Sequence, residues 1–400
     1  MKILNFRALY RFDGYVVEKV VVEDIGVQVK MRFDGRRGPC CPRCSGGLTA
    51  HRKGVGLAAD LPLADHRTVW VTFPVVQGKC AACDSFVTTR PAEIHPTRRT
   101  TWRWMRCVSS WAAACPTSTV AARFAISEST VRRYDQEVLQ HDLPEPCLDG
   151  IEALLVDEKA VRKGHGYVTV VINALTGELL HMDDGKKKES LLSFFAKLSI
   201  EQKASIRAVG IDRNGAYRAV IDQQLPHAEV VHDRFHLMMN LNAALDEIRR
   251  AEWHKASKED KRVIKGSRFL VLAGRENLSR DGEQRLEKLV ELNSQLTRAY
   301  LLKEDFRGIY QTTHTPEQAQ SRLNDWCTAA LTSALQPICR FAKGLLRDVK
   351  GFTAYFKHRI TSGPIEAFNN QMARFIHRSC GITNLDYLFL KMRAQSLQQN

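Results

Sequence analysis

The stretch LLVDEKAVRKGHGYVTVVINALTGELLHMDD, residues 154–184, contains three apolar runs separated by short glycine-containing segments. Runs rich in valine, isoleucine and leucine favour β-strands, and Gly164 and the Thr176–Gly177 pair favour turns between them. The stretch therefore predicts an antiparallel meander of three strands. The first strand carries two adjacent acids, Asp157 and Glu158, which positive residues follow at once, so carboxylates lie next to a cluster of positive charge.

The residues after this meander alternate between helical and strand patterns. KESLLSFFAKLS and RNGAYRAVIDQQL are typical of helices, whereas IRAVGID and AEVVHD are typical of buried strands. Three strands, a helix, a strand, a helix and a strand form the order of an RNase H-like domain. In that order the first and fourth strands are neighbours. Asp157 and Asp212, which closes IRAVGID, are therefore predicted to meet at one end of the sheet.

A third acid follows a long helical block. From about Leu237 to Phe356 the apolar residues recur at helical spacing without a convincing strand pattern, which predicts an all-α insertion. After this block, Ser362 can cap a helix that has Pro364 in its first turn, so Glu366 is predicted near the amino end of that helix. The insertion would thus deliver the third carboxylate to the other two.

Three carboxylates from separate elements suit divalent cations, which prefer oxygen ligands. Asp157, Asp212 and Glu366 are predicted to hold two Mg²⁺ or Mn²⁺ ions that serve in-line phosphoryl transfer on a phosphodiester. Positive side chains beside the acids would attract and position the nucleic-acid backbone. These predicted DNA-contacting residues are Lys159, Arg162, Lys163, His165, Arg374 and Arg378.

Each acid also has a structural interpretation. Glu158 should point to the opposite side of the strand from Asp157 and act structurally. Asp212 precedes RNGAY and is equally compatible with a turn former or a helix N-cap. Asp183, Asp184 and Asp222 are rival acids, for which solvation at the surface is the simpler role.

Eleven cysteines occur in the chain, and four of them form two CxxC pairs. The sequence shows neither a signal peptide nor an apolar segment of about 18 residues, so we expect a cytoplasmic protein with reduced cysteines. Cys41, Cys44, Cys80 and Cys83 are then predicted to bind one structural Zn²⁺. The spacer between the pairs exceeds the usual ribbon spacing of about 15–20 residues, and Cys40 could replace a neighbour. Isolated cysteines predicted to be small core residues are Cys107, Cys115, Cys147, Cys327, Cys339 and Cys380.

A pair of short helices is predicted between the cysteines and the acidic stretch. In PTSTVAARFAISESTVRRYDQEVL, residues 116–139, one helix runs over Ser118–Phe124 and a turn follows at Ala125–Glu128. The second helix has Ser127 or Ser129 as its N-cap. This layout is that of a DNA-binding helix-turn-helix, although a structural helical hairpin has the same outline. Residues that the second helix would present to DNA are Ser129, Thr130, Arg132 and Arg133.

The charge of the chain favours an anionic partner. Lysine and arginine number 59 against 44 aspartates and glutamates, a formal net charge of +15, and the excess occurs on both sides of residue 150. A surplus spread in this way indicates an extended anionic partner, with nucleic acid as the first candidate and an anionic membrane surface as the second.

Together these patterns predict a multidomain α+β chain. It comprises a zinc-ribbon-like β domain that opens with a hairpin broken at Asp24–Gly26, a helix-turn-helix, and an RNase H-like α/β catalytic domain interrupted by an all-α insertion. HDLPEPCLDG, with two prolines, is predicted as a linker. The predicted segments are 1–95 for the hairpin and zinc finger, 96–145 for the helix-turn-helix, 150–236 for the first catalytic part, 237–357 for the insertion and 358–400 for the last catalytic part with the third acid.

Four segments carry a resemblance to a known family. VDEKAVRKGHGYVTVVINALTGELL, GIDRNGAY, VVHDRFHLMMNLNAALDEIRR and SGPIEAFNNQMARFIHRSCGITNLDYLFLKMR are similar to the ISL-three family of bacterial insertion-sequence transposases, and the likeness covers almost the whole chain. The resemblance implies that Asp157, Asp212 and Glu366 are the DDE triad. Asp233 and His236 in HDRFH resemble the DxxH element of related transposases and would lie beside the triad, with His236 supporting a ligand rather than binding metal.

The resemblance also implies an activity. The protein would bind the terminal inverted repeats of its element through the zinc finger and helix-turn-helix, cleave DNA strands and join 3′-ends to a target. Such chemistry needs two element ends held together, which implies a homodimer or a higher assembly on DNA. One alternative is a domesticated, non-catalytic DNA-binding regulator. Another is an RNase H-like structure-selective nuclease, which would cut strands without joining them.

Overall fold

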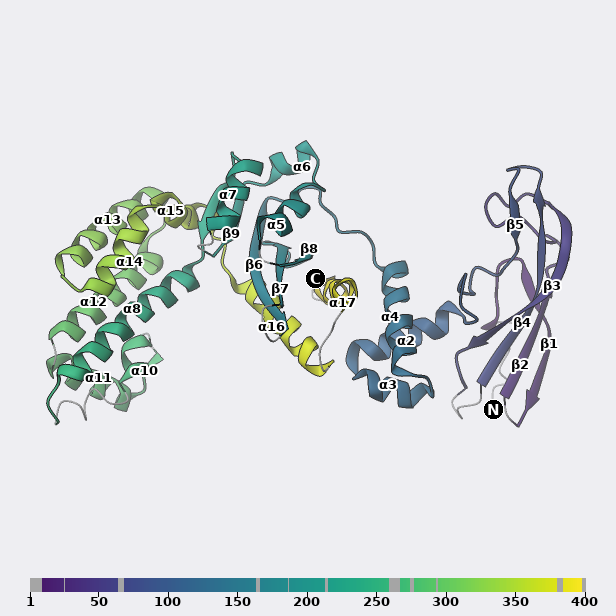
Figure 1. Ribbon diagram of the computed structural model, residues 1–400, viewed down its shortest axis with the longest axis horizontal. Helices are drawn as coiled ribbons and strands as arrows, with labels where there is room; N and C mark the ends of the chain where they lie inside the picture. Colours follow the sequence, from purple (N-terminus) through teal and green to yellow (C-terminus); the bar gives the residue numbers. More distant parts are fainter. Residues whose placement is uncertain are drawn as a thin grey trace. The chain divides into compact units, whose positions relative to one another are not determined.

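The computed structural model describes residues 9–24, 26–63, 68–162, 166–185, 187–212, 215–258, 267–273, 277–292, 294–379 and 384–397 (Figure 1). Sheets and helices are both present, so the chain is mixed α and β. It divides into two compact units, Met1–Pro144 and Glu145–Asn400. The division falls inside HDLPEPCLDG, the segment that the sequence predicts as a linker.

The first unit contains a five-stranded sheet in the order β1-β2-β4-β3, with β5 paired to β4. Its strands are β1 (Tyr15–Glu23), β2 (Gly26–Phe33), β3 (Leu48–Asp60), β4 (Thr68–Cys80) and β5 (Phe86–Thr88). β1 and β2 form the predicted hairpin, in which Glu23 pairs with Gly26. β3 and β4 form a long antiparallel ribbon. β3 starts after the first cysteine pair and β4 ends at the second, so both pairs lie at the same end of the ribbon. Alternate residues of the inner strands fill the core, among them Val27, Val29, Val71 and Phe73.

After the sheet, the described residues of the first unit form three helices: α2 (Trp102–Ala114), α3 (Thr117–Phe124) and α4 (Glu128–Asp142). Between α3 and α4 the chain turns at Ala125, whose φ of 51° is left-handed. Ser127 caps α4, because its hydroxyl accepts the N–H of Thr130 at 3.2 Å, so the first of the two predicted caps is confirmed. Val108, Val120 and Val131 from the three helices share one apolar cluster.

A buried aspartate ties this sheet to these helices. Asp60, the last residue of β3, is fully buried and accepts hydrogen bonds from the Tyr10 hydroxyl at 2.8 Å and the Thr101 hydroxyl at 2.5 Å. The Arg103 guanidinium on the first turn of α2 pairs with both of its oxygens. Because a buried charge is tolerated only when it is paired and hydrogen-bonded, this network fixes where α2 leaves the sheet.

The second unit is built on another five-stranded sheet, in the order β10-β9-β6-β7-β8. Its strands are β6 (Ala153–Arg162), β7 (Gly166–Asn173), β8 (Leu179–Asp184), β9 (Ala208–Ile211) and β10 (Glu229–His232). β6, β7 and β8 form the predicted antiparallel meander, and Gly177 in its second turn has a φ of 73°. β9 runs parallel to β6, and β10 runs parallel to β9. The neighbouring positions predicted for the first and fourth strands are confirmed.

Helices cover both faces of this sheet. Leu154 and Val156 of β6 share an apolar cluster with residues of α5 (Lys188–Phe195) and α7 (Gly215–Gln224). The short helix α6 (Ile200–Ser205) leads into β9. Leu155 belongs to the other cluster, with residues of the insertion and of the carboxyl-terminal helices. The alternation of β6 side chains therefore gives Asp157 the same face as Leu155.

The helical insertion separates β10 from the last two helices, as the sequence predicts. Within the described residues its helices are α8 (Arg234–Lys255), α10 (Arg268–Leu272), α11 (Arg280–Leu292), α12 (Ser294–Thr312), α13 (Pro316–Thr332), α14 (Gln336–Leu346) and α15 (Val349–His358). Phe306, Trp326 and Phe352 pack together in its core. Afterwards α16 (Gly363–Arg378) packs against β6 and α17 (Leu385–Leu397) against β8 (Figure 1). Among the helices described, none is long and apolar enough to cross a membrane.

Candidate active site and cysteine cluster

Three aspartates stand in a row across adjacent strands of the second unit. Val156 of β6 is paired with Ile211 of β9, and Ile211 is paired with His232 of β10. The residue after each of these is an aspartate: Asp157, Asp212 and Asp233. Because the three strands are parallel and neighbouring strands lie about 4.8 Å apart, their carboxylates emerge at one level of the sheet. The predicted meeting of Asp157 and Asp212 thus has a structural basis in the strand register.

The Asp157 carboxylate is half-buried and held from two sides. Its Oδ1 accepts the N–H of Glu158 at 2.8 Å, and its Oδ2 accepts a hydrogen bond from Asn369 Nδ2 at 2.6 Å. Burial raises the pKa of Asp157; the two hydrogen bonds and the charge of His236 oppose this rise, while the charge of Asp212 adds to it. The net direction is upward, because burial outweighs the two hydrogen bonds and the charge of His236.

Glu366 lies in the first turn of α16 and is half-buried. The Ser362 hydroxyl donates a hydrogen bond to its Oε1 at 2.5 Å. The prediction that Ser362 caps this helix is wrong in one respect. Ser362 occupies the N-cap position and Pro364 lies in the first turn, but the Ser362 hydroxyl does not cap the backbone. The backbone of Ser362 is already helical, so its hydroxyl is directed to the Glu366 carboxylate instead.

Asp233 and His236 connect the start of α8 to the acids. Asp233 caps α8 by accepting the N–H groups of Phe235 at 3.1 Å and His236 at 3.3 Å. His236 Nδ1 lies 2.6 Å from Asp233 Oδ2, and its Nε2 lies 3.9 Å from Asp212 Oδ2. The hydrogen bond to Asp233 raises the pKa of His236, as do the charges of Asp212 and Asp157, and outweighs burial. Asp233 is therefore occupied with capping and with orienting His236.

The three predicted catalytic acids do not bring three carboxylate oxygens within 4.8 Å of one another. Within the described ranges, the only group of three or more potential metal ligands whose donor atoms lie within 4.8 Å of one another is made of cysteines. Asp157, Asp212 and Glu366 thus do not converge on a single point.

The other acids considered in the sequence have structural partners or are exposed. Glu158 is paired with Thr169 of β7, whose hydroxyl lies 2.7 Å from the Tyr217 hydroxyl of α7, so Glu158 faces α7 on the other side of the sheet, as predicted. Asp183 accepts a hydrogen bond from Ser193 at 2.7 Å, and Asp222 pairs with Arg218 at 2.9 Å. Asp184 is exposed. These contacts favour Asp157 and Asp212 over their rivals.

Positive residues predicted to touch DNA occupy two elements of the second unit. Lys159 is half-buried and shares the face of β6 with Asp157, two positions earlier. Arg162 ends β6, whereas Lys163 and His165 lie outside the described residues. On α16, Arg374 is exposed, and the half-buried Arg378 has its guanidinium 5.6 Å from the centre of the Phe375 ring.

The first turns of α4 are polar and accessible in the first unit. Ser129, Arg132 and Arg133 are exposed and Thr130 is half-buried. Arg132 pairs with Glu128 at 3.2 Å, and Arg133 donates to the Thr130 hydroxyl at 3.3 Å. Both guanidinium groups are therefore held by weak surface contacts, which an anionic ligand can replace.

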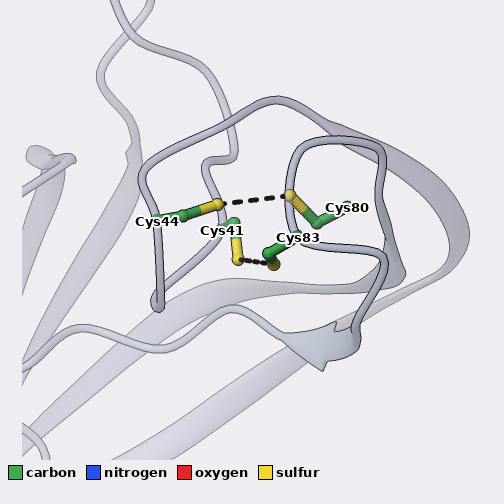
Figure 2. A group of neighbouring side chains, drawn as sticks. All are labelled: Cys41, Cys44, Cys80 and Cys83. Atoms are coloured by element: carbon green, nitrogen blue, oxygen red, sulfur yellow. Dashed lines mark hydrogen bonds between the residues drawn. The ribbon is translucent and has the colours of Figure 1, made fainter.

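Four cysteine sulfurs converge where the β3–β4 ribbon ends (Figure 2). Cys41 Sγ lies 3.7 Å from Cys83 Sγ, and Cys44 Sγ lies 3.5 Å from Cys80 Sγ. Four thiolates about 2.3 Å from one zinc ion would be separated by about 3.8 Å, which is close to these distances. Cys40 does not belong to the group, because its sulfur contacts the carbonyl oxygens of Arg37 and Gly38. The convergence of the predicted ligands is confirmed, and zinc itself stays a prediction.

The isolated cysteines only partly match the prediction that they are core residues. Cys327 and Cys339 are buried, and Cys107 and Cys115 are half-buried. The prediction is wrong for Cys147, which is exposed because it lies in the extended segment after α4. Cys380 lies outside the described residues.

The second unit matches a known protein family. A family model described as transposase, DDE_Tnp_ISL3, matches residues 154–392. The chain belongs to this transposase family. Among its relatives, a transposase for insertion sequence element IS1001 from Bordetella parapertussis is 30% identical over 389 residues, which cover 96% of this chain and 95% of the relative. Transposases for IS1557 from two Mycobacterium tuberculosis strains are 24% identical over 414 residues, with 92% and 89% covered.

The residues that the transposase family model matches correspond to defined parts of the second unit. The matched range begins three residues before Asp157 and ends within α17, so it includes the sheet, the whole insertion and all three predicted acids. The first unit lies outside this range, but the alignment with the IS1001 transposase covers 96% of the chain. Membership of a family of DDE transposases of insertion sequences implies that the chain acts on DNA.

Proposed function

We propose that the second unit is an RNase H-like catalytic domain in which Asp157, Asp212 and Glu366 form the DDE triad for DNA strand cleavage and strand transfer. The observation that carries this proposal is the strand register. Asp157 and Asp212 directly follow paired residues of parallel neighbours, and α16, which carries Glu366, packs on the same β6 strand. The family match supports the assignment because it spans all three acids.

The donor set fits hard divalent cations. The three residues offer carboxylate oxygens, which Mg²⁺ and Mn²⁺ prefer, and Asp212 is open to solvent while Asp157 and Glu366 are half-buried. Asp157, Asp212 and Glu366 would hold two such ions. When bound, a pair of ions activates a water or a 3′-hydroxyl as the attacking group and stabilises the leaving oxygen of the phosphodiester.

The side chains around the acids orient and balance this site. Two fixed hydrogen bonds hold the Asp157 carboxylate in one orientation, and Ser362 does the same for one oxygen of Glu366. His236, whose raised pKa favours its charged form, places positive charge beside Asp212. Lys159 follows Asp157 on the same face of β6, where an ammonium group attracts the sugar-phosphate backbone toward the acids.

The first unit is proposed to recognise the terminal inverted repeats of the element. α3 and α4 would form a helix-turn-helix, with Ser129, Thr130, Arg132 and Arg133 of α4 directed to the major groove. The cysteine cluster would hold one structural Zn²⁺, which fixes the end of the β3–β4 ribbon as part of the same DNA-binding unit. Joining two element ends requires two copies of the site, so we propose a homodimer or a higher assembly on DNA.

Strand cleavage on a labelled terminal-repeat duplex with Mg²⁺ tests the catalytic assignment. The wild type should nick the duplex at the element end and, with target DNA added, join the 3′-end to it. Asp157→Ala and Glu366→Gln should abolish both steps. Asp222→Asn is the matched control, because Asp222 is a rival acid that pairs with Arg218 on α7, and it should keep full activity.

Three results would contradict this function. Binding without cleavage by the wild type would favour the non-catalytic regulator. Cleavage without joining, with a preference for branched substrates, would favour the structure-selective nuclease. Cleavage that survives Asp157→Ala would place the active site elsewhere.

A further inference from the structure

Asn369 is a buried polar residue that the triad leaves without a role. It lies on α16 three positions after Glu366, so the two side chains occupy the same side of the helix. Asn369 is 7% exposed, whereas its neighbour Asn370 is exposed. The Asn369 Nδ2 group donates a hydrogen bond to Asp157 Oδ2 at 2.6 Å across 212 positions of sequence. This contact joins the helix that carries one acid to the strand that carries another.

The bond from Asn369 completes a two-point anchor on Asp157. The N–H of Glu158 occupies Oδ1 and the amide of Asn369 occupies Oδ2. A carboxylate whose two oxygens each accept one fixed donor cannot rotate freely about its terminal bond. Each oxygen still has a second lone pair, which stays available to another ligand. The anchor therefore orients Asp157 without using up its capacity to bind.

The other end of the Asn369 amide argues against a role in packing alone. Its Oδ1 is buried and has no hydrogen-bond partner among the described residues. An unpaired buried acceptor is unfavourable, and an apolar side chain of the same size would avoid that cost. Asparagine at this position is explained by the bond that its Nδ2 group donates, rather than by the interior that it fills.

We propose that Asn369 is a positioning residue of the active site, which holds the Asp157 carboxylate in its ligand orientation and fixes α16 against β6 at the turn that carries Glu366. This inference rests on the proposed catalytic function. It adds a residue that touches an acid of the triad from the element of another acid. Loss of the amide should leave Asp157 free to rotate and α16 free to shift, so both acids would bind divalent cations less well.

Binding of Mn²⁺ to the full-length protein tests this role without relying on activity. Free Mn²⁺ is measured by electron paramagnetic resonance during titration of the wild type, Asn369→Ala, Asn369→Leu, Asn370→Ala and Asp157→Ala. Variants at residues that support a metal ligand typically weaken metal binding by about 10- to 100-fold, and we expect this for both Asn369 variants. Asn370→Ala is the matched control on the same helix and should bind like the wild type.

A thermal unfolding curve separates positioning from folding. Asn369→Leu keeps the side-chain volume and removes the unpaired acceptor, so its melting temperature should stay within about 4 °C of the wild type while Mn²⁺ binding falls. Unchanged Mn²⁺ affinity in both Asn369 variants would overturn the positioning role and leave the triad intact. Failure of both variants to fold would assign Asn369 to stability alone. If the wild type shows no Mn²⁺ binding that Asp157→Ala removes, the proposed function fails and this inference fails with it.

Discussion

Replacing Cys80 with serine should release zinc and loosen the end of the β3–β4 ribbon. Cys80 is the last residue of β4 and is fully buried, and its sulfur lies 3.5 Å from that of Cys44. Serine has nearly the same shape but offers a hydroxyl that stays protonated at neutral pH. The variant would therefore keep three thiolates in an arrangement whose distances suit four. Cys40→Ser is the matched control, because the Cys40 sulfur faces backbone carbonyls outside the cluster.

The magnitude follows from how little else stabilises this end of the ribbon. The local apolar cluster has three buried members, Cys41, Cys80 and Val87, and two that are partly buried. Burying one valine contributes about 1.5–3 kcal/mol, whereas four-ligand zinc sites in small peptides contribute about 10–16 kcal/mol at pH 7. Metal should therefore dominate the stability of this end. The main core of the sheet, with Val29, Val71 and Phe73, contains no cysteine and should persist.

Metal analysis and hydrogen exchange together check this expectation. Protein purified without chelator should contain about one zinc per chain for the wild type and Cys40→Ser, and less than about one tenth of that for Cys80→Ser. Amide protection should fall over residues 40–48 and 80–88 and remain over β1 and β2. Zinc retained by Cys80→Ser, or zinc lost from Cys40→Ser, would refute the assignment of the four ligands. Loss of protection throughout the sheet would refute the argument that the metal acts locally.

Three further perturbations test other parts of the chain. Replacing Arg132 and Arg133 with alanine should weaken binding to a terminal-repeat duplex in a fluorescence titration. The slope of log K for binding against log salt concentration should become shallower by an amount that corresponds to about two phosphate contacts, and an unchanged slope would exclude α4 from the DNA interface. Asp60→Asn should lower the free energy of unfolding by about 3 kcal/mol in urea, because Arg103 loses its buried partner. Burial raises the pKa of Asp60, but Arg103 and the neighbouring hydroxyls lower it by more, so the folded-state pKa lies below the unfolded value of about 3.9. The stabilisation by Asp60 should therefore be present in the wild type above that pH and be lost as pH falls through the folded-state pKa. Parallel curves of stability against pH for the wild type and Asp60→Asn between pH 7 and pH 2 would contradict this expectation. Glu158→Gln should keep strand cleavage, because Glu158 faces α7 on the side of the sheet away from the acids, and loss of cleavage with intact folding would reassign the first acid.

The strand order and the placement of the first two acids could be predicted because local patterns decide them. Valine-rich runs with glycine at the turns produce the β6–β7–β8 meander, and the residue that closes each later strand is polar. Once the order of strands is known, the neighbouring strands follow, and so does the approach of Asp157 to Asp212. The convergence of the cysteine sulfurs could be predicted for a similar reason, because each CxxC pair occupies one turn.

Features that depend on contacts with residues far away in the sequence could not be predicted. β3 includes Gly54 and Gly56 and faces solvent over most of its length, so its pattern has neither the alternation nor the composition of a typical strand. It is a strand because β4 pairs with it. The Ser362 hydroxyl could accept a backbone N–H of its helix or donate to a carboxylate, and only the structure shows that it donates to Glu366. Helical spacing from Ile365 and Met372 puts Asn369 rather than Asn370 on the buried face of α16, but nothing in FNNQMA identifies its partner, which is on β6.

The register of the sheet also explains how a long insertion can precede the third acid without disturbing it. The insertion leaves at Asp233, directly after the strand end that is in register with Val156 and Ile211, and the chain returns through Ile360. A Cβ atom at Gly210 would lie 3.2 Å from Ile360 and 2.6 Å from Leu155, so the returning segment crosses β9 where glycine leaves room. Ser362 contributes to the lowered pKa of Asp233, so the two ends of the insertion lie near each other. Because the entropy cost of closing a loop grows only slowly with its length, a long helical insertion between Asp233 and Ser362 costs little more to close than a short one.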